Sequence, residues 1–168
     1  MLAAPVITAA LALFWGATSI TGWQLQPDHG PNRPAPEMAW HQIEVYYEQI
    51  GTRLRETYGV TASTPVASAD IGAIGYFSGA RIVDTVGLVT PELSAYYPID
   101  PALVVDEQNY AIPPQLIYDT DPDYLVTMEA FVRLGLEQEA AFQQQYELAE
   151  EIPTDFYGTG MRLYQRVQ

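Results

Sequence analysis

The stretch Pro65-Val-Ala-Ser-Ala-Asp-Ile-Gly-Ala-Ile-Gly-Tyr-Phe-Ser-Gly-Ala-Arg-Ile-Val-Asp84 decides the fold class of this chain. Residues 65–69 are small or apolar and predict a short strand. Residues 70–79 predict a turn into a brief helix, and residues 81–84 predict a second short strand. A strand, a helix and a strand in close succession indicate a sheet with a helix packed against it.

Three more strands are predicted downstream of this stretch. Tyr124-Leu-Val-Thr127 is the first of them. Residues 146–152 and 161–167 form the other two, joined by a turn around Tyr157-Gly-Thr-Gly160 as an antiparallel hairpin. The fold class is therefore α/β, with a small mixed sheet of about five strands and flanking helices.

Helices are predicted on both sides of the opening stretch. A small helix begins at Pro91 after the N-cap Thr90, and a short polar helix covers residues 137–145. Between them, residues 96–114 are rich in proline and lack a period, which predicts a long surface loop. Upstream, one helix carries an apolar stripe at three- and four-residue steps and stops at Gly59, the stripe being Trp40, Ile43, Tyr47, Ile50, Leu54 and Tyr58.

The predicted core of the domain combines that stripe with the inward faces of the strands. Its members are apolar residues at positions that a sheet and an amphipathic helix bury together. We expect the core to include Ile43, Ile50, Leu54, Val66, Ile82, Val83, Leu125, Val126 and Leu163.

The N-terminus has the pattern of a membrane-spanning helix. Residues 2–23 carry no charged side chain, and the first charged residue of the chain is Asp28. At about 1.5 Å per residue this run is about 33 Å long, against about 30 Å for the hydrocarbon core of a bilayer. A cleaved signal peptide is the alternative, although no basic residue precedes the apolar run. We therefore predict a transmembrane helix over residues 1–23, with the lipid bilayer as its partner through residues 2–23.

The apolar run is also rich in small residues. Helices that pack against one another in lipid favour such residues at their contacts, so other membrane-protein chains are predicted partners. The small residues are Ala3, Ala4, Ala9, Ala10, Ala12, Gly16, Ala17 and Ser19. Prolines at residues 27, 31, 34 and 36 then predict a Pro-rich tether over residues 24–37, followed by an acidic domain over residues 38–168.

Composition excludes several classes of function. The 21 acidic residues outnumber 7 basic ones, which gives a net charge of −14 and disfavours nucleic acid as a partner. Cysteine is absent, so disulfides, zinc–thiolate sites and cysteine nucleophiles are impossible. Only two His residues are present, and Asp119-Thr-Asp-Pro-Asp123 lacks the later Gly and Glu of a calcium loop. We predict no metal site and no cofactor.

Six residues around the opening stretch form the candidate site. Asp70 and Asp84 end two adjacent predicted strands, and open α/β sheets bind ligands at that edge. The candidates that accompany them are Gly72, Gly75, Tyr76 and Arg81. Two interpretations remain open, namely binding or acid–base chemistry by the carboxylates, and a structural turn in which the carboxylates cap backbone N–H groups. A dinucleotide fingerprint is excluded, because Asp70 stands where the first glycine of G-x-G-x-x-G belongs.

The segment Ser68-Ala-Asp-Ile-Gly-Ala-Ile-Gly-Tyr-Phe-Ser-Gly-Ala-Arg-Ile-Val-Asp-Thr-Val-Gly-Leu-Val-Thr-Pro-Glu92 resembles a known family. It is similar to part of the C-terminal extracytoplasmic domain of polytopic C-type membrane glycosyltransferases related to protein mannosyltransferases. The order of segments agrees as well, with an apolar span before it and with Pro122-Asp-Tyr-Leu-Val126 and Gly160-Met-Arg-Leu-Tyr-Gln-Arg166 after it.

The resemblance implies a fold and a topology but no activity. Those enzymes have many membrane helices and carry their catalytic acid in the first extracytoplasmic loop, whereas this chain has one predicted span and no such loop. No catalytic residue is therefore carried over. We expect a non-catalytic, single-pass membrane protein whose C-terminal domain is extracytoplasmic and resembles the terminal part of a lipid-linked-sugar glycosyltransferase. The alternatives are a single-span accessory subunit that docks in a larger membrane complex and an enzyme that uses Asp70 and Asp84.

Overall fold

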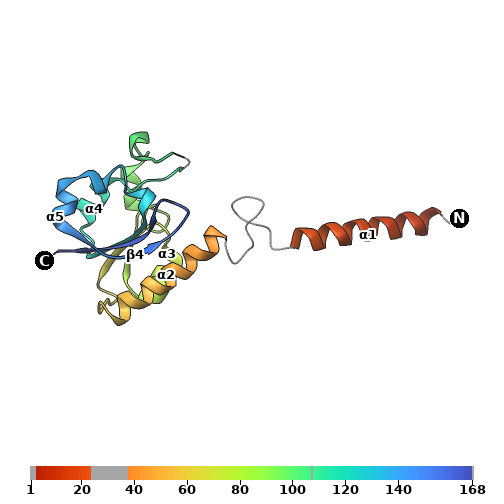
Figure 1. Ribbon diagram of the computed structural model, residues 1–168, viewed down its shortest axis with the longest axis horizontal. Coiled ribbons are helices and arrows are strands. Elements are labelled where there is room, and N and C mark those ends of the chain that lie inside the picture. Colours follow the sequence, from red (N-terminus) through yellow and green to blue (C-terminus); the bar gives the residue numbers. More distant parts are fainter. Residues whose placement is uncertain (1–2, 24–37, 107, 168) are drawn as a thin grey trace. The chain divides into compact units, whose positions relative to one another are not determined.

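The computed structural model describes residues 3–23, 38–106 and 108–167 (Figure 1). The chain divides into two units, Met1–Gln42 and Ile43–Gln168, which are described separately. The predicted tether over residues 24–37 lies outside the described residues.

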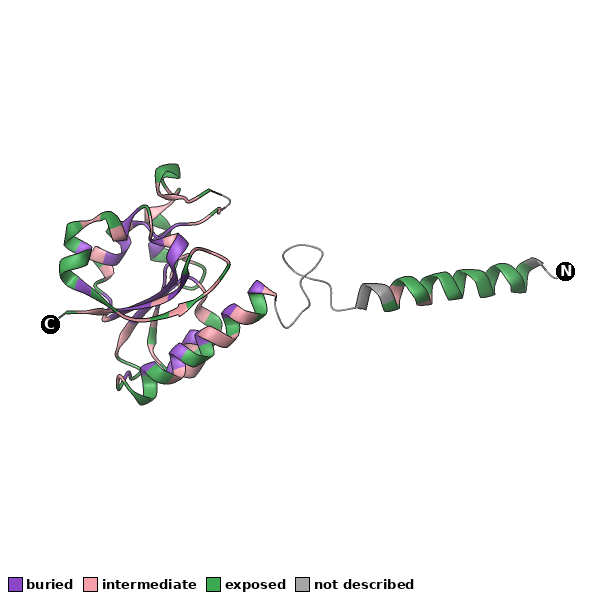
Figure 2. Cartoon of the chain, in the orientation of Figure 1, coloured by how far each residue is buried: buried purple, intermediate pink, exposed green. Residues whose placement is uncertain are grey.

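The first unit contains helix α1, Ala3–Trp23. Alanine and leucine favour the helix, and the Thr18 hydroxyl donates back to the carbonyl oxygens of Phe14 and Trp15, at 3.0 Å each. Between residues 4 and 20 the large apolar side chains of α1 are exposed (Figure 2). The predicted helix is confirmed. Among the described residues no helix is both long and apolar enough to cross a membrane, so the predicted span stays a prediction.

Helix α2, Ala39–Glu56, forms because its apolar residues fall on one side at helical spacing. Ile43, Tyr47, Ile50 and Leu54 are fully or almost fully buried, which confirms most of the predicted stripe. The prediction that Trp40 belongs to the buried stripe was wrong, because this residue is 51% exposed. The helix ends three residues before Gly59, and a backbone bond from Val60 N to Leu54 O closes the turn in which Gly59 adopts φ +69°.

The sheet has five strands in the order β2-β1-β3-β5-β4. β1 pairs in parallel with β2 and with β3, whereas β5 pairs antiparallel with β3 and β4. The predicted mixed sheet with flanking helices is thus confirmed, and every predicted strand agrees within a residue or two. The strands are β1 Pro65–Ser68, β2 Arg81–Asp84, β3 Tyr124–Met128, β4 Tyr146–Pro153 and β5 Gly160–Arg166.

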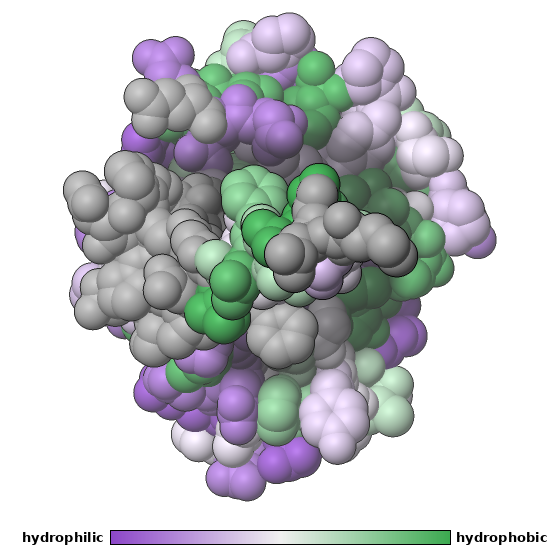
Figure 3. Space-filling view, turned by 90° about the vertical axis from the view of Figure 1, so that its right-hand side faces the viewer, coloured by the Kyte–Doolittle hydropathy of each residue, from purple (hydrophilic) through white to green (hydrophobic). Residues whose placement is uncertain are grey.

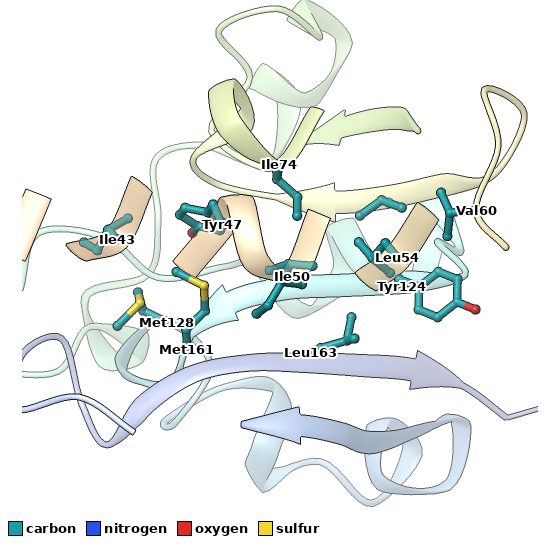
Figure 4. Packing of buried hydrophobic residues seen from close by; sticks show 12 residues of the cluster. Ile43, Tyr47, Ile50, Leu54, Val60, Ile74, Tyr124, Met128, Met161 and Leu163 are labelled. Atoms are coloured by element: carbon teal, nitrogen blue, oxygen red, sulfur yellow. The ribbon is translucent and has the colours of Figure 1, made fainter. Parts of the chain in front are cut away.

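Helices cover both faces of the sheet (Figure 1). α2 and α3, Ile71–Ser78, lie on one face, and α4, Pro114–Thr120, and α5, Ala140–Gln145, lie on the other. Successive residues of a strand point to opposite faces, so each strand contributes to two cores. The core under α2 and α3 is shown in Figure 4 and consists of Ile43, Tyr47, Ile50, Leu54, Val60, Val66, Ile74, Tyr124, Val126, Met128, Met161 and Leu163.

The second core fills the face under α4 and α5. It includes Ala67, Leu116, Ile117, Leu125, Phe142 and Tyr164. The predicted core residues are buried except Ile82, which is half-buried near the edge of the sheet. Outside these cores the surface is mixed: Tyr76, Leu88 and Val89 are exposed, and both hydrophilic and hydrophobic side chains appear on the face in Figure 3.

The segment between β2 and β3 differs most from the prediction. The helix predicted at Pro91 is a 3₁₀ helix, Pro91–Tyr96, and a second 3₁₀ turn covers Pro101–Leu103. The predicted surface loop was wrong at its end, because Ala111 and Ile112 are buried and Ile112 N donates to Phe131 O at 2.8 Å. Helix α4 was not predicted. Proline occupies its first turn, where no N–H partner is needed.

After β3 the chain makes two short 3₁₀ turns, Glu129–Phe131 and Leu136–Gln138. The second of these turns and α5 together replace the single helix predicted over residues 137–145.

Candidate functional site

Asp84 ends β2 at the carboxyl edge of the parallel strands, opposite Ser68 at the end of β1. Its side chain is fully buried. One carboxylate oxygen accepts a bond from Val86 N at 3.0 Å and the other accepts from Val89 N at 2.7 Å. Both oxygens therefore bind backbone N–H groups of the turn that follows the strand, which is the bonding expected of a structural carboxylate.

Asp70 lies next to the same edge, at the N-cap of α3. Its carboxylate makes no cap bond to that helix and accepts instead from the Tyr47 hydroxyl at 3.2 Å. Burial raises the pKa of the Asp70 carboxyl, and the bond from Tyr47 opposes this rise. Burial, reinforced by the negative charge of Asp70, raises the pKa of Tyr47 well above its ordinary value, so Tyr47 remains a donor.

The two candidate glycines differ in what surrounds them. A Cβ on Gly75 would lie 3.1 Å from Ile82 Cγ1, so this glycine lets α3 pack closely on β2. A Cβ on Gly72 would meet nothing within 4 Å. Helices α2 and α3 approach each other closely at Gly51 of α2, which sequence reasoning missed: a Cβ there would lie 3.0 Å from Phe77 Cβ and 3.2 Å from Ser78 N.

The structure does not bring Arg81 and Tyr76 to the two carboxylates. Arg81 begins β2 and Asp84 ends it, so their backbones are about 10 Å apart at about 3.3 Å per residue. The Arg81 side chain is exposed, and the described ion pairs do not include it. The Tyr76 side chain is 81% exposed and contacts the ring of Phe77 edge-on, with 5.1 Å between centroids. The described hydrogen bonds of the two carboxylates come instead from the Tyr47 hydroxyl and from the backbone N–H groups of Val86 and Val89.

Thr85 and two tyrosines complete the edge, and sequence reasoning missed all three. Thr85 is fully buried, and its hydroxyl accepts from the Tyr110 hydroxyl at 2.8 Å. The Tyr97 hydroxyl donates to the Thr85 carbonyl oxygen. Burial raises the pKa of both tyrosines, so both stay protonated at neutral pH. These bonds fasten the segment before α4 over the turn that Asp84 holds. Since each tyrosine is more than ten residues from Thr85 in sequence, no local spacing signals the contact.

A third carboxylate, Glu129, follows β3 at the same edge and is 4% exposed. It accepts from Arg133 Nε at 2.6 Å, from a terminal Arg133 nitrogen at 2.5 Å and from Thr159 N at 3.1 Å. The bonds from Arg133 hold the pKa of Glu129 below its usual range. Gly158, at φ +97°, leaves room for this contact, because a Cβ there would clash with the Glu129 carboxylate and lie 2.7 Å from Ala130 N. Glu129 thus ties the tip of the β4–β5 hairpin to the end of β3.

The three carboxylates of this edge, Asp70, Asp84 and Glu129, have separate sets of described hydrogen-bond partners. Each buried oxygen that has been described binds a donor from the fold, and in the described part of the chain no three His or acidic side chains gather in a group that would hold a metal ion. The acids once considered for calcium are also engaged: Asp121 and Asp123 bind Arg166 at 2.8 and 2.5 Å. The arrangement is suited to holding three loops at one edge.

The chain belongs to a family defined as a domain of unknown function (DUF8728), whose model matches residues 36–165. This range covers the predicted domain from just before α2 almost to the end of β5. Neither the curated proteins nor the solved structures include one that matches the chain.

Proposed function

We propose that this DUF8728 chain is a non-catalytic, membrane-tethered domain that docks in a larger membrane complex handling lipid-linked sugar. The observation that carries the proposal is the run of exposed apolar side chains on helix α1: Leu13 and Trp15 are each 75% exposed and Phe14 is 68% exposed. Exposed apolar side chains of this size along one helix favour lipid or other helices as its surroundings. The absence of charge from residues 2–23 supports lipid as that surrounding.

The non-catalytic part of the proposal is supported by the carboxyl edge of the parallel strands. Catalysis by Asp84 requires an oxygen that reaches a substrate, and both of its oxygens are bonded to backbone N–H groups in a fully buried position. The lipid-linked-sugar context rests on the resemblance of residues 68–92 to the C-type glycosyltransferases. The small residues of α1 support equally a domain that corresponds to the terminal part of a glycosyltransferase and a single-span accessory subunit.

The first test is membrane integration. We expect the full-length chain to stay in the membrane through carbonate extraction and to keep its N-terminus in an intact-mass measurement. A soluble chain that begins near residue 20 would instead assign residues 1–23 to a cleaved signal peptide and remove the basis of the proposal.

The second test is docking through the small face of α1. Ala12 and Gly16 lie one turn apart, and leucine at both positions keeps the helix apolar while blocking close helix packing. We expect the double variant Ala12→Leu/Gly16→Leu to remain in the membrane but to lose a multi-span glycosyltransferase that co-purifies with the native chain. The matched control Val6→Leu/Ile7→Leu should keep it. Equal recovery with both variants, or no multi-span partner with the native chain, contradicts docking through α1.

A further inference from the structure

A hollow of about 310 Å³ lies at the edge of the sheet opposite the candidate carboxylates. Its walls come from the connection between α2 and β1, the start of β3 and the end of β5. Because β5 runs antiparallel to β3, its last residues arrive where β3 begins. The side chains that matter here are Tyr58, Thr64, Asp123, Tyr124, Gln165 and Arg166.

One wall of the hollow is aromatic. The rings of Tyr58 and Tyr124 meet edge to face, with 5.7 Å between their centroids. Tyr124 closes the row of core side chains beside Val60, and its hydroxyl points away from the other labelled side chains (Figure 4). The Tyr58 hydroxyl donates to Glu150 Oε1 at 3.0 Å. Burial and this bond raise the pKa of Tyr58 to about 12, and burial also raises the pKa of Tyr124. Both phenols are therefore uncharged at neutral pH.

The other wall is polar and balanced in charge. Arg166 donates to Asp123 Oδ1 at 2.5 Å and to Asp121 Oδ2 at 2.8 Å, so the guanidinium and the carboxylate that line the hollow are paired with each other, and Arg166 also binds a second acid outside the lining. Gln165 Nε2 lies 3.5 Å from the Tyr124 hydroxyl, at the outer limit of a hydrogen bond. The Gln165 amide offers both donors and an acceptor to a better partner. Thr64 adds a hydroxyl at the rim.

From this lining we infer that the hollow binds a neutral, hydroxyl-rich ring, namely a single sugar residue. Each sugar hydroxyl both donates and accepts, which matches a wall of carboxylate, guanidinium, amide and phenol groups. The C–H face of the ring matches the tyrosine wall. The net charge of −14 repels anions, and the Asp123–Arg166 pair leaves no unpaired carboxylate for a cation. The volume is at the lower end of the roughly 300–1,000 Å³ range of ligand sites, which limits the ligand to one small ring.

This site is independent of the docking proposed above. All its lining residues follow Gln42, so α1 contributes none of them. Sugar binding can therefore fail while docking holds, and docking can fail while the hollow still binds sugar.

The test is a titration of the ¹⁵N-labelled full-length chain with the methyl glycosides of glucose, galactose and N-acetylglucosamine. The chain is held in a zwitterionic detergent, because detergents with sugar headgroups would compete. We expect at least one glycoside to shift the Gln165 side-chain amide signals and the backbone signals of Gly59 and Val60 saturably, with a dissociation constant of about 1 mM. Absence of a saturable shift with all three glycosides overturns the inference.

Two variants make the assignment specific. Gln165→Leu keeps the size of the side chain and removes its donors and acceptor, and we expect it to weaken binding about tenfold. Gln49→Leu makes the same exchange on the exposed side of α2 and should leave binding unchanged. Unchanged affinity in Gln165→Leu overturns the assignment to this hollow. An equal response of the native chain to the linear polyol sorbitol overturns the specificity for a ring.

Discussion

The two edges of the sheet contrast in how their polar groups are used. At the carboxyl edge of the parallel strands, Asp84 and Glu129 are buried and bonded to backbone N–H groups or to Arg133. At the opposite edge, Gln165 and the Asp123–Arg166 pair line a hollow that remains open. The carboxyl edge, where α/β sheets usually bind ligands, is here the edge whose polar groups are hydrogen-bonded within the fold. The difference teaches that strand ends predict where polar groups gather, whereas their hydrogen bonds decide whether they are available.

The largest expected loss of stability follows from replacing Asp84. Replacing it with alanine leaves the N–H groups of Val86 and Val89 without their acceptors, and each bond to a charged acceptor is worth about 1.5–3 kcal/mol. We expect Asp84→Ala to lower the free energy of unfolding by about 3–5 kcal/mol in chemical denaturation followed by near-UV circular dichroism. The exposed acid Glu44, changed to alanine, is the control. A loss no larger than that of the control would make Asp84 available for function.

The next effect is on the hairpin tip that Glu129 holds. Gly158→Ala forces a Cβ into the Glu129 carboxylate and against Ala130 N at a φ that disfavours side chains. We expect a loss of about 2–4 kcal/mol in the same denaturation measurement. Gly72→Ala provides a control with open space around the new Cβ. Equal stability of the two variants would show that Glu129 does not fix the tip.

A smaller effect, with a sign that depends on pH, is expected for Asp70. Its pKa is raised in the folded state, so its ionisation lowers stability as pH rises from its ordinary value through the raised one. Asparagine keeps an acceptor for Tyr47 and removes the charge, so Asp70→Asn should change stability by at most about 1 kcal/mol. The difference in the free energy of unfolding between Asp70→Asn and the native chain should therefore favour the variant more at about pH 7 than at about pH 4.

Glu129→Gln should show the opposite dependence of stability on pH to Asp70→Asn. The pKa of Glu129 is lowered in the folded state, so its contribution is present above its ordinary pKa and is lost as pH falls. The cost of Glu129→Gln should therefore be greater at about pH 7 than at about pH 4. Pairs of unfolding curves at the two pH values measure both trends, and parallel trends in the two variants would contradict these assignments.

The smallest effect on stability is expected at the open edge. The only described hydrogen bond of the Gln165 side chain is the long 3.5 Å contact with the Tyr124 hydroxyl, so Gln165→Leu should change the free energy of unfolding by no more than about 0.5 kcal/mol. Its thermal transition should coincide with that of Gln49→Leu. A large loss would mean that this edge is fastened like the other, and the contrast between the edges would disappear.

Much of the fold was predictable because its signals are local. The strands around Asp70 and Asp84 and the stripe of α2 follow from periods of two and 3.6 residues, which burial on one face imposes directly on sequence. The separation of Arg81 from Asp84 was also predictable, because the two residues stand at opposite ends of a four-residue strand and its ends are about 10 Å apart. Helix α4 was missed because it is a short helix that begins at a pair of prolines in a segment without a period.

The sequence by itself determined the charge, the exclusion of thiol chemistry, the strand-helix-strand unit and the apolar N-terminal helix, because each depends on residue type or short spacing. Only the tertiary structure decided which polar groups are satisfied by hydrogen bonds within the fold. Tyr97 and Tyr110 reach Thr85 from a distant segment, and Thr159 N reaches Glu129 from the hairpin. The hollow between Tyr58, Tyr124 and Gln165 likewise exists because β5 runs back beside β3. Hydrogen-bond satisfaction is a property of the packed chain, since it joins residues whose separation in sequence carries no signal.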